Sequence, residues 1–235
     1  MAEIIVVYRL GITNYEDAWR LQQTMHRRCQ TSGENILLLT EHFPVVTLGY
    51  RRPYHQLRVP VDELRKKGVA LFEVERGGGA TYHGPGQLVA YPIFSSLFRY
   101  LGVRRFISSL EEVMYRVCAR YDVPTVRKSG YPGLWVDTRK IGTVGIAVRR
   151  GTALHGLALN VNIEMSAFSD IVPCGLEGCR VTSLTEAVGR ECTMAETVEF
   201  LIEAFNGVFA APIEERYDVG CSVEREALTG PVAHH

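Results

Sequence analysis

The sequence predicts an α+β fold in which helices flank a mixed or antiparallel sheet. Many short runs rich in β-branched residues indicate strands, and only two or three segments have long helical periodicity. Because these helices do not alternate one for one with the strands, a regular βαβ architecture is disfavoured. A length of 235 residues, with 46% apolar and 22% charged residues, is typical of one globular domain.

The first part of the chain predicts several strands and two helices. Ile4–Tyr8 is a β-branched run and predicts a strand. Thr13 and Glu16 match a capping box, and apolar residues at helical spacing predict a helix over Tyr15–Cys29. Pro60 suits the first position of a short helix that ends at Gly68. Further strands are expected at Ile36–Thr40, Val45–Gly49, Ala70–Glu75 and Leu88–Phe94.

The second part predicts a long helix, a hairpin and a final helix. An apolar stripe that includes Cys118 predicts a helix over Val103–Tyr121, with this cysteine in the core. Tyr131–Val136 indicates a turn into a strand. The strands Lys140–Val148 and Ala153–Asn162 would be joined by the turn Arg149-Arg150-Gly151. A capping box at Thr193 opens the last helix, and from Pro212 the tail is charged and weakly patterned.

The charge balance and the spacing of the cysteines limit the class of protein to which this chain can belong. Lys and Arg together equal Asp and Glu, at 26 each, so no overall field attracts nucleic acid or a membrane. We expect no signal peptide and no membrane span. The six cysteines form no CxxC pair and no metal-ligand pattern, which favours reduced thiols in a cytoplasmic protein: Cys29, Cys118, Cys174, Cys179, Cys192 and Cys221. His234-His235 is compatible with a tag remnant.

A glycine-rich stretch, Arg76–Pro92, is the strongest functional signal. It reads RGGGATYHGPGQLVAYP, with one Arg and one His among five glycines. Glycine lets backbone approach a ligand closely, so the stretch predicts a shaped ligand channel. The alternative is a long hairpin. No GxxxxGK[ST], Rossmann fingerprint or HExxH occurs, which argues against a phosphate loop, a dinucleotide site and a metal hydrolase.

Cys174 is the candidate nucleophile. It lies between Pro173 and Gly175, directly after an apolar pair, on a turn that would hold the thiol in a reachable position. A thiol needs a base or a nearby cation to become a thiolate. His83, His155 and Lys140 are all candidates, and spacing does not choose among them.

Four blocks together resemble the lipoyl(octanoyl) transferases, the octanoyl-[acyl-carrier-protein]:protein transferases of lipoate biosynthesis. They are RGGGATYHGPGQLVAYP, KIGTVGIAV, HGLALNVN and IVPCGL followed by VTSL, within about residues 10–209. The resemblance implies a single catalytic domain with the fold of biotin and lipoate protein ligases. It also implies that the residue matching Cys174 forms an acyl thioester, and that Lys140 lowers the pKa of this cysteine. We expect Lys140 to serve as general acid and base as well.

The resemblance further implies the acyl-binding segments. They match Arg76, Gly77, Gly78, Gly79, Ala80, Thr81, Tyr82 and His83, then Thr143, Val144 and Gly145, then Gly156, Leu157 and Ala158. We expect His155, next to the last segment, to be a supporting residue. We expect a bulky residue at Gly78 or Gly156 to block acyl loading while leaving the fold intact.

The implied donor is octanoyl-acyl carrier protein, which presents the acyl group on its phosphopantetheine arm. The implied acceptors are lipoyl domains of 2-oxoacid dehydrogenase E2 subunits and the glycine-cleavage H protein. We expect no metal, no cofactor and no ATP, and a monomer. An ATP-dependent lipoate ligase, a cysteine thioesterase and a non-catalytic acyl-binding module remain the alternatives.

Overall fold

A computed structural model describes residues 3–216 and confirms the α+β class. Within these residues nine strands form one mixed sheet, ordered β12-β1-β2-β6-β10-β9-β8-β7, with β11 beside β9. The first three strands are parallel, and those from β2 to β7 pair antiparallel. Their bounds are β1 Ile5–Thr13, β2 Asn35–His42, β6 Gln87–Phe94, β7 Val126–Lys128, β8 Tyr131–Val136, β9 Arg139–Arg149, β10 Thr152–Asn160, β11 Arg180–Val181 and β12 Ile213–Glu215.

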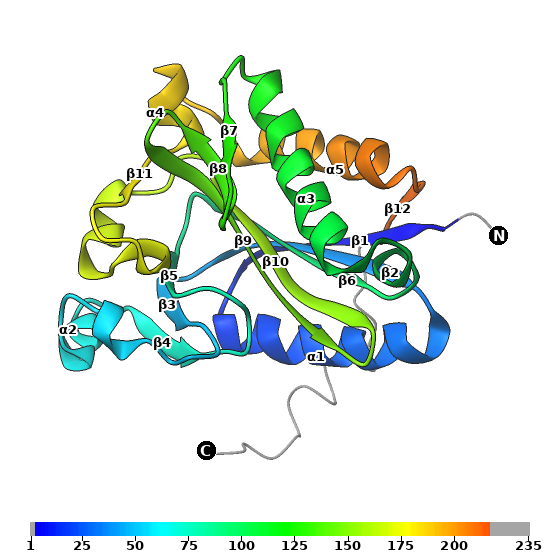
Figure 1. Ribbon diagram of the computed structural model, residues 1–235, viewed down its shortest axis with the longest axis horizontal. Helices are drawn as coiled ribbons and strands as arrows, with labels where there is room; N and C mark the ends of the chain where they lie inside the picture. Colours follow the sequence, from blue (N-terminus) through cyan, green and yellow to red (C-terminus); the bar gives the residue numbers. More distant parts are fainter. Residues whose placement is uncertain (1–2, 217–235) are drawn as a thin grey trace.

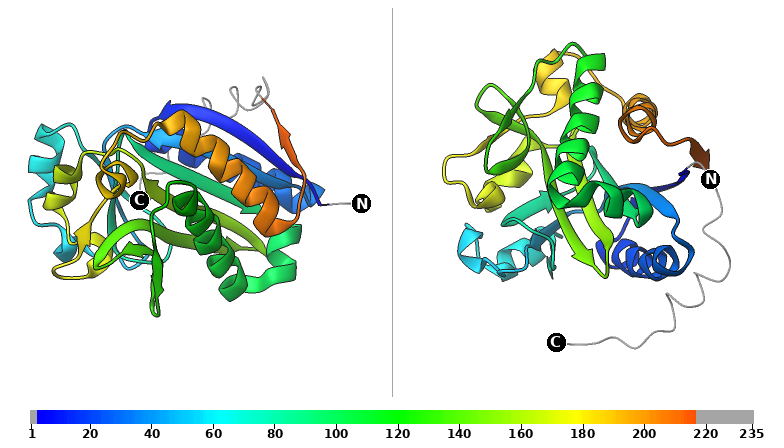
Figure 2. Two further views of the ribbon diagram at one scale, coloured as in Figure 1. Left: turned by 90° about the horizontal axis from the view of Figure 1, so that it is seen from above. Right: turned by 45° about the vertical axis from the view of Figure 1, so that its right-hand side comes forward.

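Helices cover both faces of this sheet (Figure 1). Helix α1 (Tyr15–Ser32) packs on one face, against β6 and β10. Helices α3 (Ser96–Arg120) and α5 (Met194–Phe209) lie on the other face and enclose the larger apolar core. Figure 2 shows the sheet between these two layers from two further directions.

A second, three-stranded sheet lies at one end of the large sheet (Figure 1). Its order is β4-β3-β5, and its central strand pairs with β5, which is part of the glycine-rich stretch. The remaining bounds are β3 Val45–Leu48, β4 Ala70–Glu73, β5 Ala80–His83, α2 Val61–Lys66, α4 Leu184–Val188, and the 3₁₀ turns Tyr54–Gln56, Met165–Asp170 and Pro173–Gly175.

The structure confirms one predicted helix cap and differs from the prediction at the starts of two other helices. Thr193 caps α5 by accepting from the Glu196 amide, as its capping box predicts. Thr13 does not cap α1, because its hydroxyl pairs with Thr40 at the end of β1. Helix α3 starts before Val103, and non-helical backbone at Gly102 divides it near the predicted start.

Two further differences concern segments predicted to lack regular structure. The glycine-rich loop contains strand β5, and the start of the tail contains β12, which pairs parallel to β1. Cys118 is fully buried in the core, as expected, and the five cysteines within residues 3–216 are free thiols. Cys221, His234-His235 and most of the predicted tail lie outside the described residues. None of the helices between residues 3 and 216 has the length and hydrophobicity to cross a bilayer.

Candidate active site

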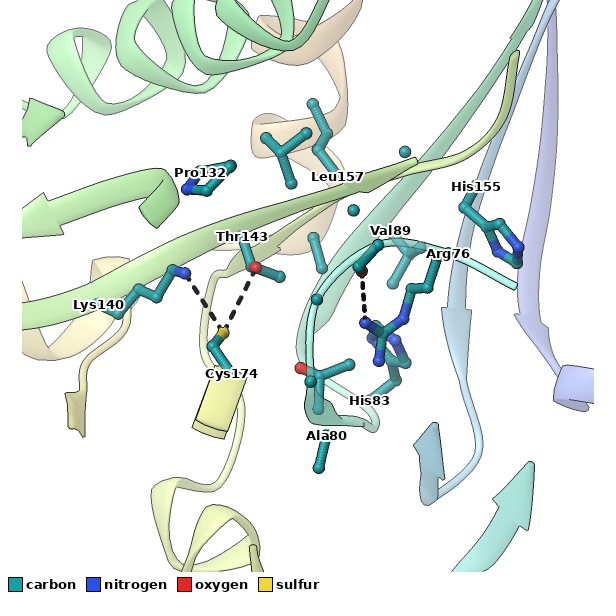
Figure 3. A pocket seen from close by; sticks show the side chains of 18 of the residues that line it. Arg76, Ala80, His83, Val89, Pro132, Lys140, Thr143, His155, Leu157 and Cys174 are labelled. Atoms are coloured by element: carbon teal, nitrogen blue, oxygen red, sulfur yellow. Dashed lines mark hydrogen bonds between the residues drawn. The ribbon is translucent and has the colours of Figure 1, made fainter. Parts of the chain in front are cut away.

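Cys174 and Lys140 meet at one end of a pocket (Figure 3). The Lys140 ammonium donates to Cys174 Sγ at 3.3 Å, and Thr143 Oγ1 lies 3.7 Å from the same sulfur. Lys140 is only 5% exposed, so little water screens its charge. A shielded cation in contact with sulfur stabilises the thiolate, which is the nucleophilic form.

A bulge in β9 brings Lys140 and Thr143 to the same sulfur. In a regular strand, residues three apart point to opposite faces. Here β8 pairs Leu134 with Gly142 but the next residue, Trp135, with Lys140, so one residue of β9 is unpaired. The extra residue rotates Lys140 onto the face that Thr143 occupies. The sequence pattern KIGTVGIAV carries no visible sign of this bulge.

The backbone of the 3₁₀ turn Pro173–Gly175 presents the thiol. Cys174 has φ +57°, in the left-handed region that L-residues other than Gly rarely adopt. Such a conformation costs about 1–2 kcal/mol and is found where surrounding structure enforces it. The turn therefore holds the Cys174 thiol in a fixed orientation, as its Pro and Gly neighbours predict.

The pocket has a volume of about 140 Å³ and is lined mainly by backbone and apolar side chains. It brings together nearly all the residues that sequence analysis assigned to acyl binding. Tyr82 is the exception, because its ring packs against Phe168 at 5.5 Å and does not line the pocket. Sequence reasoning missed other lining residues: Tyr15, Val89, Tyr91, Gly130, Tyr131 and Pro132.

Arg76 is a buried cation that shapes the glycine-rich loop. Its guanidinium donates to Thr47 O at 2.8 Å, to Thr47 Oγ1 at 2.7 Å and to Gly77 O at 3.0 Å. No carboxylate among residues 3–216 forms an ion pair with it. Burial lowers the pKa of Arg76, but guanidinium stays charged under ordinary conditions. Its positive charge therefore faces the pocket, and hydrogen bonds to oxygen acceptors hold the guanidinium in place.

The two candidate histidines lie beyond Arg76, on the other side of the loop from Cys174 (Figure 3). Burial lowers the pKa of His83 to about 3 and that of His155 to about 3, so both rings are neutral at pH 7. His83 Nδ1 donates to Gln87 Oε1 at 2.6 Å, and the ring of His155 stacks on Trp19 at 4.9 Å. Of the three candidate activators, only Lys140 contacts the thiol.

Gly156 has a structural reason to be glycine that sequence analysis did not foresee. A Cβ at this position would lie 2.1 Å from Ala90 O and 2.5 Å from Pro92 Cδ, both on the adjacent strand β6. The expectation that a bulky residue here leaves the fold intact is therefore wrong. At Gly78 the backbone has φ +92°, so a substitution is strained there as well, although a Cβ would meet only Arg76 Nη1 at 3.4 Å.

Comparison with known proteins identifies the family. The family described as "Lipoyl protein ligase A/B catalytic domain" matches residues 14–206. An octanoyltransferase of Desulfovibrio desulfuricans is 40% identical over 203 residues, which cover 86% of each chain. One of Mycolicibacterium smegmatis is 40% identical over 226 residues, 92% of this chain and 96% of that protein. The chain belongs to the octanoyltransferase family. Octanoyl transfer in protein lipoylation is the activity that this family carries.

Solved structures place the family on the fold of lipoate protein ligases. Lipoate-protein ligase A bound with ATP matches with a TM-score of 0.79 at 19% identity, covering 97% of this chain and 93% of that one. A bi-partite lipoate protein ligase from Thermoplasma acidophilum matches with a TM-score of 0.76 at 20% identity, covering 97% and 91%. At these identities the likeness confirms the predicted fold.

Proposed function

We propose that octanoyl transfer proceeds through a thioester on Cys174, with octanoyl-acyl carrier protein as donor and lipoyl domains as acceptors. The observation that carries this proposal is the 3.3 Å contact between Lys140 Nζ and Cys174 Sγ at one end of the apolar pocket. Nucleophile, charge partner and acyl site then form one continuous unit.

In the first half-reaction, the Cys174 thiolate attacks the donor's thioester carbonyl. The bond from carbonyl carbon to the phosphopantetheine sulfur breaks, and Lys140 gives its proton to the departing thiolate. The products are an octanoyl thioester on Cys174, a free phosphopantetheine thiol and a neutral Lys140 amine. One thioester replaces another, so the step is nearly isoenergetic and we propose that it needs no ATP and no cofactor.

In the second half-reaction, the neutral amine of the acceptor lysine attacks the Cys174 thioester. An amide bond forms, the bond from carbonyl carbon to Sγ breaks, and the neutral Lys140 takes the proton that the acceptor nitrogen loses. This returns the ammonium and the thiolate to the starting state. Lys140 is thus the proposed general acid of one half-reaction and general base of the other.

The apolar lining supports an acyl chain as the pocket's occupant. Val89, Val144 and Leu157 contribute side chains, and bare backbone at Gly77 and Gly145 leaves room between them. Burying an eight-carbon chain contributes about 0.8 kcal/mol per CH₂ group. Lipoyl domains are the proposed acceptors because the matching Thermoplasma acidophilum ligase is described together with its E2 lipoyl domain. The glycine-cleavage H protein is a further proposed acceptor.

The test supplies two sets of substrates to the purified protein. The first contains octanoyl-acyl carrier protein and a lipoyl domain without ATP, and the second contains free octanoate, ATP and the lipoyl domain. The proposal expects octanoylated lipoyl domain only from the first set. Product only from the second set would favour ligase chemistry, and free octanoate without acylated acceptor would favour a thioesterase.

A further inference from the structure

Gln56 joins the wall of the pocket to the nucleophile. It is the last residue of the 3₁₀ turn Tyr54–Gln56, and neither its sequence context nor any motif marks it. Its side-chain Oε1 accepts from the Ala80 amide at 2.7 Å, where the glycine-rich loop enters β5. Its backbone carbonyl accepts from the Val172 amide at 2.7 Å, two residues before Cys174.

The carboxamide of Gln56 also fits between two glycines that flank the site. A Cβ at Gly79 would lie 2.2 Å from Gln56 Oε1 and 3.0 Å from the carbonyl carbon of Cys174. A Cβ at Gly175 would lie 2.5 Å from Gln56 Nε2. Both positions therefore have room for the amide of Gln56 only because they lack a side chain. The glycine-rich loop, Gln56 and the cysteine turn are in direct contact.

The two links of Gln56 depend on different atoms. The link to the cysteine turn uses main-chain atoms, and it continues through the Arg58 amide, which donates to Asp170 O at 2.8 Å, and through the bridge between Leu57 and Ile171. The link to the glycine-rich loop uses the side-chain amide alone. A substitution at Gln56 would release the loop and keep the main-chain pairing.

We propose that Gln56 is a positioning residue for octanoyl transfer, whose side-chain amide fixes the acyl-binding wall at Gly79 and Ala80 relative to Cys174. This inference rests on the proposed function, since it takes Cys174 as the acylated residue. The attacked carbonyl carbon must sit within about 3–3.5 Å of the nucleophile for efficient reaction. A wall that moves relative to the sulfur would lose this alignment while the thiol itself keeps its lysine partner.

The test compares Gln56→Leu with the wild type in two reactions of Cys174. Single-turnover acylation by octanoyl-acyl carrier protein needs the acyl wall, whereas alkylation by iodoacetamide needs only the thiolate. We expect acylation to slow on the order of tenfold, because small misplacements are costly. Alkylation should stay within about twofold, because Lys140 still contacts the sulfur. Hydrogen exchange of the Ala80 amide should speed up.

His55→Leu is the matched control, because His55 is an exposed neighbour in the same turn. It should leave both reactions unchanged. If Gln56→Leu lowers Tm by more than about 5 °C, the test uses Gln56→Asn in its place. The amide of Asn is one methylene too short to reach Ala80, so the same slow acylation and unchanged alkylation are expected.

Two kinds of result would overturn the inference. One is wild-type acylation, or unchanged Ala80 exchange, in a folded Gln56 variant. The other is an equal fall in acylation and alkylation, which would assign Gln56 to activation of the thiol instead. A wild-type protein that forms no acyl-enzyme would reject the proposed function itself, so the two failures are distinguishable.

Discussion

Replacing Lys140 by Met should remove most of the reactivity of Cys174. The ammonium lies 3.3 Å from Sγ, and the side chain is 5% exposed. At an effective dielectric constant of about 20, two unit charges at this distance attract by about 5 kcal/mol. The cost of burying the ammonium offsets part of this attraction, and removing one partner of a buried charge pair costs about 3 kcal/mol. At about 1.4 kcal/mol per factor of ten, the rate at which Cys174 is alkylated should fall roughly a hundredfold.

The assay is the rate of iodoacetamide alkylation of Cys174 at pH 7, followed by intact mass. Met fills nearly the same volume as Lys, so the packing around Trp135 is kept. Lys128→Met is the matched control, because Lys128 Nζ lies over the same Trp135 ring at 4.1 Å but has no contact with Cys174. The control should alkylate within about threefold of the wild type. A Lys140→Met protein that alkylates as fast as the wild type would refute the charge-pair argument.

Three other predictions concern stability. Gly156→Ala should destabilise the fold by about 2 kcal/mol or more, because its Cβ would clash with the neighbouring strand β6. Gly77→Ala should cost far less, because the nearest atom to its Cβ would lie at an ordinary 3.7 Å. Equal Tm values for the two variants would contradict this prediction. Thr47→Val removes a hydroxyl acceptor from the buried guanidinium of Arg76 and should lower the free energy of unfolding in urea by about 1–3 kcal/mol. An unchanged free energy of unfolding would show that the backbone acceptors suffice. Burial lowers the pKa of His83 to about 3 in the folded protein, whereas its pKa in the unfolded chain is about 6.5. The unfolded chain therefore binds a proton first, and the free energy of unfolding falls as pH drops below about 6.5. By pH 5 this histidine should account for about 2 kcal/mol of the loss, and the loss should be that much smaller in His83→Gln; equal losses in the two proteins would contradict the prediction.

The parts of the site that depend on local constraints can be predicted from the sequence. The turn around Cys174 could be predicted because Pro and Gly restrict the backbone on either side of the thiol. The glycine-rich loop could be predicted because so many glycines are costly unless the backbone needs them. Long amphipathic elements such as the helix at Val103–Tyr121 were found for a similar reason, since their pattern repeats over many residues.

The parts of the site that cannot be predicted from the sequence depend on strand register and on long-range contacts. Lys140, and not His83 or His155, contacts the thiol because of a bulge in β9, and no residue type in the sequence predicts this bulge. Tyr82 was assigned to the pocket with its neighbours, but alternation along β5 turns its ring toward Phe168. Gln56 is a single polar residue on a short turn, and its partners lie 24 and 116 residues further along the chain. Strand register and long-range contacts, and not local propensity, decide these cases.

The decisive experiment on octanoyl transfer follows the formation of an acyl-enzyme at Cys174 and its transfer to an acceptor. The wild-type protein is mixed with octanoyl-acyl carrier protein without ATP, separated from the donor and followed by intact mass spectrometry. A covalent route through Cys174 predicts one octanoyl adduct that hydroxylamine removes, that peptide mapping assigns to Cys174, and that moves to a lysine of an added lipoyl domain. It also predicts no adduct in Cys174→Ser. Transfer to the lipoyl domain without any adduct, or at an undiminished rate in Cys174→Ser, would contradict a covalent route through this residue.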